Sequence, residues 1–111
     1  MDVLPEVAAA VDGRATILID GGFMRGTDVA KAIAMGADCV GIGRLECLGL
    51  AAAGTPGLVR ALEILEDEVR ICLGLMGASS LSVLDRASLH VAIPVAPAHA
   101  VSAFPLLEEG Y

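Results

Sequence analysis

The sequence predicts an α/β fold in which parallel strands alternate with helices, as part of a larger barrel or sheet. Two short apolar runs, Ala15–Ile19 and Asp38–Ile42, contain β-branched residues and are interpreted as strands that are buried on both faces. Strands joined by a helical crossover are parallel. Because two strands alone leave open edges and uncovered faces, we expect this chain to be a section of a larger structure.

Three helices are expected around these strands. The segment Leu4–Val11 is rich in helix-forming residues. Thr27 is expected to cap the crossover helix, which runs to Met35 and stops at Gly36. A further helix is expected over Arg44–Ala53, directly after the second strand.

A turn over Gly54–Gly57 is predicted to precede the clearest helix, which ends at Gly77. Its expected buried face steps by three and four residues through Leu58, Leu62, Leu65, Val69, Cys72 and Met76. Short helical turns are expected around Asp85. We therefore divide the chain into a barrel section, residues 1–90, and a proline-containing tail, residues 91–111.

Charge excludes one class of function. The net charge is −7, from 7 Lys and Arg against 14 Asp and Glu, and aromatic residues make up only 3%. A nucleic-acid-binding protein needs a basic face for the phosphates and often aromatic rings for stacking. We therefore expect no nucleic-acid partner.

Cysteine usage and hydropathy indicate the compartment. Cys39, Cys47 and Cys72 are odd in number and lie in apolar segments, which predicts buried free thiols in a reducing compartment, the cytoplasm. The N-terminus lacks the pattern of a signal peptide. The stretch Ala87–Leu107 has no acidic or basic residue but contains three prolines, so no transmembrane segment is expected.

Two loops are the candidate functional site. Parallel strands open at the same edge of a sheet, so the loop Asp20-Gly21-Gly22 and the pair Gly43-Arg44 should lie about one strand spacing apart, ~5 Å. Glycines allow the backbone to approach a ligand closely, and a helix N-terminus and an arginine both attract anions. Each loop alone is more often a simple tight turn, but together they predict a phosphate site, which such barrels often place after their last two strands.

The run IDGGFMRGTDVAKAIAMGADCVGIGRLECLGLAAAG, followed by LVRALEILEDEVRICLGLMGASSLSVLDRASL, resembles the FMN-dependent 2-hydroxy-acid dehydrogenases and oxidases. This family includes glycolate oxidase, lactate oxidase, mandelate dehydrogenase and flavocytochrome b2. The resemblance covers Leu4 to about Leu89 and implies the C-terminal section of a (β/α)₈ TIM barrel. It also implies FMN as the cofactor and oxidation of a 2-hydroxy acid to a 2-oxo acid as the activity.

The resemblance implies that the FMN phosphate is bound by Asp20, Gly21, Gly22, Gly43 and Arg44. Family members commonly have an arginine two residues after the second glycine of the first loop. That position is Met24 here, and the arginine follows at Arg25. Arg25 is a further candidate for binding the cofactor, with a structural ion pair as the alternative.

The family's histidine base and its neighbouring arginine belong to an HGGRQ-like motif that this chain does not contain. His90 and His99 have no acidic residue beside them in sequence and are not expected to be catalytic. No catalytic residue and no metal site are therefore assigned. The chain is expected to be inactive alone and to need the missing N-terminal barrel section or a partner chain. When complete, the enzyme is expected to be a homo-oligomer.

Two other interpretations stay open at this point. The chain could be a non-catalytic phosphate-binding or interaction module derived from such a barrel. It could also be part of another flavin- or phosphate-binding barrel, similar to isopentenyl diphosphate isomerase or IMP dehydrogenase. The match between Arg44 and Leu89 favours the 2-hydroxy-acid enzymes over the latter group.

Overall fold

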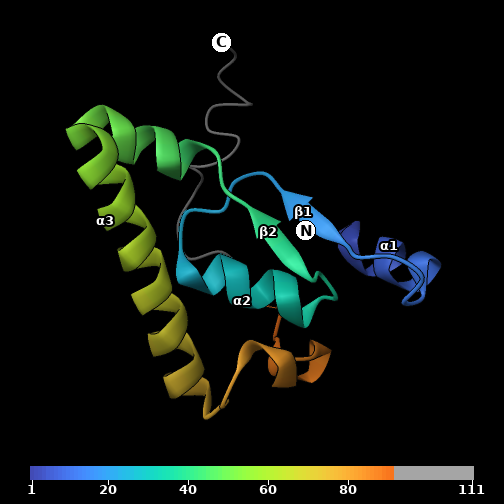
Figure 1. Cartoon of the computed structure of the whole chain (residues 1–111). Coiled ribbons are helices and arrows are strands. Elements are labelled where there is room, and N and C mark those ends of the chain that lie inside the picture. The colour runs from blue at the N-terminus through green and yellow to red at the C-terminus, as the bar shows by residue number, and fades with distance from the viewer. Residues whose placement is uncertain (92–111) are drawn as a thin grey trace.

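The computed structural model describes residues 1–91 and contains a two-stranded sheet with three α-helices (Figure 1). The elements follow one another as α1 (Leu4–Val11), β1 (Leu18–Asp20), α2 (Gly26–Ala34), β2 (Cys39–Gly41) and α3 (Arg44–Met76). Two 3₁₀ turns, Leu81–Val83 and Arg86–Ser88, complete the described chain. These turns confirm the short helical turns predicted around Asp85. Apart from Val91, the predicted proline-containing tail and His99 lie outside the described residues.

The two strands are parallel, as predicted, with α2 as their crossover. Leu18 pairs with Cys39, Ile19 with Val40, and Asp20 with Gly41. Both strands are shorter than the predicted runs. One reason is that the Ile17 amide donates to the Asp38 carboxylate, 2.7 Å away, instead of to the backbone of the neighbouring strand.

Burial of the strands on both faces was predicted and is wrong for this chain. Ile17, Ile19, Val40 and Ile42 pack partly buried against the core, whereas Leu18 is 69% exposed. Helix α2 lies along one side of the sheet (Figure 1). The exposure of Leu18 shows that no described element covers its side chain. One face of the sheet is therefore open.

The three cysteines are free thiols, but their predicted burial is wrong. Cys39 and Cys47 are exposed and Cys72 is half-buried. Cys39 is exposed because it lies on β2, which belongs to the incompletely covered sheet, and Cys47 because it lies in the exposed first turn of α3. The apolar sequence context therefore did not indicate burial.

Helix α2 begins at Gly26, and the prediction that Thr27 caps it is wrong. Arg25 occupies the N-cap position. Its backbone amide donates a hydrogen bond to the Asp28 carboxylate at 3.0 Å. An acidic residue three positions after the cap can satisfy an orphan amide in this way. The predicted stop at Gly36 is confirmed, because this residue has a φ of 106°, where glycine is favoured.

The core lies between α2, α3 and the covered face of the sheet. Its fully or nearly buried members are Leu4, Phe23, Val29, Ala32, Ala37 and Leu65. Gly26 allows α2 to begin directly against the backbone of α3. A side-chain carbon at that position would collide with Val69 N and with the Glu68 carbonyl carbon. The two helices therefore approach at a separation that only glycine permits.

Element α3 consists of two helical arms that meet at a sharp break, so the predicted division into two helices is confirmed. The break lies at Ala53 and Gly54, and the chain is helical again before Pro56, so the turn is shorter than the predicted range Gly54–Gly57. At the bend the two arms pass close to each other at Gly49 and Gly57. A side-chain carbon on Gly49 would lie only 2.8 Å from the Gly57 carbonyl oxygen. Figure 1 shows the short first arm leaving β2 and the longer second arm passing beside α2.

The second arm of α3 shows the predicted amphipathic pattern only in part. Leu65 is buried and Leu58, Val69 and Cys72 are half-buried, but Leu62 and Met76 are exposed. The ion pair between Glu66 and Arg70 on the outer side, 2.6 Å long, fits the favourable order of these residues.

By length and composition alone, α3 is the one described helix that could cross a membrane, with a mean hydropathy of 1.3 in its most apolar window. Six charged residues lie between Arg60 and Arg70, so an apolar window with few charges can only lie in the earlier part. That part contains the break at Ala53–Gly54 and Pro56. The apolar stretch is therefore bent.

Candidate functional site

The two candidate loops begin side by side at one edge of the sheet. Asp20 ends β1, Gly41 ends β2, and these two residues are register partners. A side-chain carbon on Gly41 would lie 3.0 Å from the Cβ of Asp20, so glycine allows the close approach of the strand ends. The structure thereby brings together the two loops that the sequence predicted to face one ligand.

The first loop turns sharply through its glycines. Gly21 has a φ of 112° and Gly22 a φ of 83°, a region that L-residues with side chains rarely adopt. The next residue, Phe23, is 4% exposed and inserts into the core. Phe23 therefore anchors the loop, a role that sequence reasoning did not assign to it.

The second loop leads into the N-terminus of α3. Gly43 occupies the N-cap position and Arg44 is the first helical residue. Both residues are exposed, and no atom lies within 4 Å of the place where a side-chain carbon on Gly43 would be. The first amides of a helix have no partner within the helix, and its dipole favours anions there. This end of α3 is open to a ligand.

The Arg25 side chain contacts the second arm of α3. Its Nη2 lies 2.9 Å from Glu68 Oε1, and its Nε donates to Glu68 Oε2 at 3.2 Å. The Gly26 amide donates to the same Oε2 at 2.8 Å. The structure therefore shows Arg25 in the ion pair that the sequence left as an alternative, and it adds Glu68, which sequence reasoning missed.

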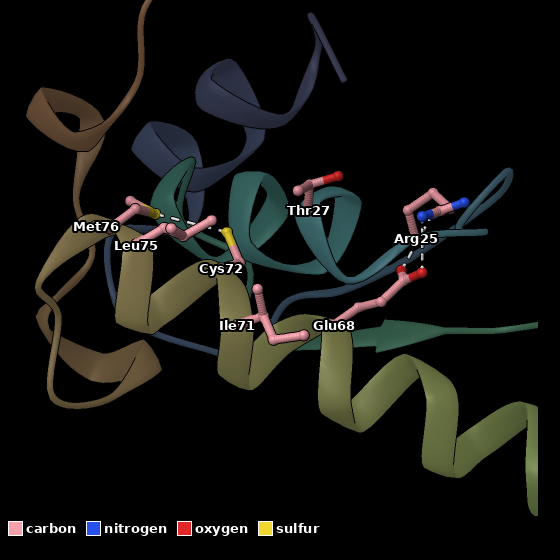
Figure 2. Close-up of a pocket in the computed structure, with 7 residues that line it drawn as sticks. All are labelled: Arg25, Thr27, Glu68, Ile71, Cys72, Leu75 and Met76. Atoms are coloured by element: carbon pink, nitrogen blue, oxygen red, sulfur yellow. Dashed lines mark hydrogen bonds and ion pairs between the residues drawn. The ribbon is translucent and has the colours of Figure 1, made fainter.

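Figure 2 shows this contact at one end of a hollow of about 490 Å³ between the start of α2 and the second arm of α3. The remaining lining is mostly apolar: Ile71, Cys72, Leu75 and Met76 from α3, with Thr27 from α2. The hollow therefore lies on the α2–α3 side and not between the two glycine loops.

His90 lies near the outer side of α2. It lines small hollows together with Lys31, Met35 and Leu89. Within residues 1–91 no cluster of three or more His, Cys, Asp or Glu side chains could hold a metal ion. His90 is thus not placed beside the glycine loops.

Comparison with known proteins gives the family. A family model described as FMN-dependent dehydrogenase matches residues 1–91. L-lactate oxidase from Nostoc sp. is 44% identical over 91 residues, which are 82% of this chain and 25% of the relative. Human 2-hydroxyacid oxidase 1 is 44% identical over 86 residues, which are 78% of this chain and 23% of the relative.

Solved structures agree with this assignment. A mandelate oxidase variant matches with a TM-score of 0.74 and 45% identity, over 77% of this chain and 25% of that chain. The monotopic membrane protein (S)-mandelate dehydrogenase matches with a TM-score of 0.76 and 36% identity, over 81% and 24%. The chain spans about a quarter of the length of these relatives. It belongs to the FMN-dependent dehydrogenase family, whose cofactor is FMN, and its strands and helices are a section of the family's TIM barrel.

Proposed function

We propose that this chain forms the FMN-phosphate-binding section of a 2-hydroxy-acid dehydrogenase or oxidase, which converts a 2-hydroxy acid to a 2-oxo acid. The observation that carries the proposal is the pairing of Asp20 with Gly41, which starts both glycine loops at one edge of the sheet. Family membership supplies the cofactor and the reaction type.

The residues at this edge fit a phosphate group. Gly21 and Gly22 turn the backbone without side chains, and Gly43 has open space around it. The N-terminus of α3 offers amides, and Arg44 offers a planar guanidinium that can donate two hydrogen bonds to phosphate oxygens. In our proposal Asp20 orients the first loop, while Gly43 and Arg44 bind the anion.

The chain's part in the reaction is to bind and orient the cofactor. FMN, when bound, accepts the two electrons that are removed from the 2-hydroxy acid. We assign no proton transfer to His90, because it lies near Lys31 and Met35 on the outer side of α2. The base and the carboxylate-binding arginine are proposed to come from the rest of the barrel, on the same chain or on a partner chain.

We further propose a cytoplasmic, homo-oligomeric enzyme. The free thiols Cys39, Cys47 and Cys72 support a reducing compartment. One structural relative is a monotopic membrane protein, so the completed enzyme should be tested for membrane association by fractionation.

The test uses a completed barrel, in which this chain replaces the matching quarter of the Nostoc L-lactate oxidase. A charge-assisted hydrogen bond contributes ~1.5–3 kcal/mol. Arg44→Ala should therefore weaken FMN binding by roughly tenfold to a hundredfold, as measured by flavin fluorescence. Arg70→Ala is the matched control, because Arg70 is an exposed arginine on the same helix that pairs with Glu66.

Arg25→Ala should weaken FMN binding less than Arg44→Ala, because the Arg25 side chain pairs with Glu68. Equal FMN affinity in Arg44→Ala and wild type would contradict the phosphate-site proposal. A completed barrel that binds FMN but oxidises neither lactate, glycolate nor mandelate would favour the non-catalytic module instead.

A further inference from the structure

Glu68 contacts three donors that belong to the segment just after the first glycine loop. Its Oε2 accepts from the Gly26 amide at 2.8 Å and from Arg25 Nε at 3.2 Å, while its Oε1 lies 2.9 Å from Arg25 Nη2. Figure 2 shows the Arg25 and Glu68 side chains reaching toward each other from the loop and from α3. One carboxylate thus connects α3 to the loop over 42 residues of sequence.

The ion pair by itself contributes little to stability, because the Arg25 side chain is 70% exposed and surface pairs are screened by solvent. The bond to Gly26 has a different character. The Gly26 amide is one of the first amides of α2, which have no partner inside the helix. The Glu68 side chain is only 24% exposed, and its negative charge lies at the positive end of the α2 dipole.

The geometry leaves little freedom at this contact. Gly26 lies so close to the backbone of Glu68 and Val69 that no side chain fits between α2 and α3. The amides of Met24 and Arg25 donate to the Asp28 carboxylate at 3.3 and 3.0 Å. Amides 24 to 26 are therefore held by protein carboxylates, so we place the anion-facing backbone of this loop earlier, at Gly21 and Gly22.

Helix α3 is linked to the chain at both candidate loops. It begins at Arg44 in the second loop, bends at Ala53–Gly54, and at Glu68 contacts Arg25 and Gly26, just after the first loop. A shift of Glu68 would therefore move the first loop relative to Arg44. We infer that Glu68 is a positioning residue of the FMN phosphate site, which acts through Arg25 and the Gly26 amide without touching the cofactor. This inference rests on the proposed function.

The first measurement uses the 111-residue chain itself. Glu68→Ala should speed amide hydrogen exchange in the segment 20–26, while exchange in α1 stays unchanged. Glu68→Gln should lie between the two, because its amide oxygen can still accept from Gly26 but has no charge for Arg25. Glu66→Ala is the matched control, since Glu66 lies on the same helix and pairs with Arg70.

The second measurement compares FMN with riboflavin, which lacks the phosphate, in the completed barrel. A loop held out of position weakens phosphate binding selectively, so Glu68→Ala should lower FMN affinity about tenfold and leave riboflavin affinity unchanged. Glu68→Gln should recover part of the FMN affinity, and Glu66→Ala should change neither ligand.

Three results would overturn the inference. The first is an equal loss of FMN and riboflavin affinity in Glu68→Ala, which indicates a general structural role. The second is unchanged exchange and affinity in Glu68→Ala while Arg44→Ala still loses FMN. The third is a larger FMN loss in Arg25→Ala than in Glu68→Ala, which makes Arg25 a direct ligand. If Arg44→Ala also leaves the ratio of FMN to riboflavin affinity unchanged, the proposed function itself fails.

Discussion

Asp20 and Gly41 are register partners at the ends of two parallel strands, and a side-chain carbon on residue 41 would lie only 3.0 Å from the Asp20 Cβ. The close approach sets the separation of the two loops that follow. We therefore expect substitutions of residue 41 to affect both the stability of the fold and the proposed phosphate site.

Gly41→Val should separate the strand ends, because its side chain would press on the Asp20 Cβ. Overpacking of this kind typically costs about 1–3 kcal/mol. In the completed barrel, the free energy of unfolding, from urea titration followed by circular dichroism, is expected to fall by that amount. Gly74→Ala is the control: Gly74 lies inside α3 with no atom near its missing side chain, so alanine should stabilise the helix slightly. A stable Gly41→Val chain would show that the strand ends can move apart freely.

Gly43→Ala should separate ligand binding from folding. Gly43 has a φ of −121°, outside the left-handed region, and its missing side chain meets no atom within 4 Å. We expect the unfolding free energy to change by less than about 1 kcal/mol. In the completed barrel, the added methyl group should obstruct the phosphate, so FMN affinity should fall while riboflavin affinity holds. Unchanged FMN affinity would place the phosphate elsewhere.

The 111-residue chain alone should self-associate and should not oxidise 2-hydroxy acids. One face of its sheet is open, with Leu18 69% exposed, and both strands have an unpaired edge. Size-exclusion chromatography with light scattering should show oligomers or aggregates, and Leu18→Lys should reduce them. Leu75→Lys, the same change in charge at an exposed position of α3, should have a smaller effect. A monomer that melts cooperatively and oxidises lactate would contradict this prediction.

The sequence predicted the order of elements and the parallel pairing because these depend on local patterns. β-branched runs indicate the strands, and a glycine after a helix indicates its end. Each of these signals can be read within a few residues of sequence. The bend in α3 was also anticipated from Gly54, although only Ala53 and Gly54 leave the helix and Pro56 is accommodated in the next turn.

Contacts between distant segments were harder to predict. The capping of α2 was assigned to Thr27 because a threonine is a common cap, but Asp28 and Glu68 take this role. Glu68 lies 42 residues beyond Gly26, and in the sequence it cannot be distinguished from its neighbour Glu66, which is exposed. Burial of Leu18 and Cys39 was overestimated, because local hydropathy does not tell whether the covering element is present in the same chain.

The contact between Glu68 and Gly26 has a consequence for how such barrels can be assembled. From β1 the chain passes through α2, β2 and the bend of α3, and Glu68 on α3 then contacts Gly26 at the start of α2. The path forms a closed circuit, because its end contacts a residue near its beginning, all within the 91 described residues. The spacing of the two glycine loops is then fixed by the pairing of β1 with β2 and by this circuit, all within the described segment. A segment with this property should be transferable between barrels as a unit, together with the proposed anion-binding geometry.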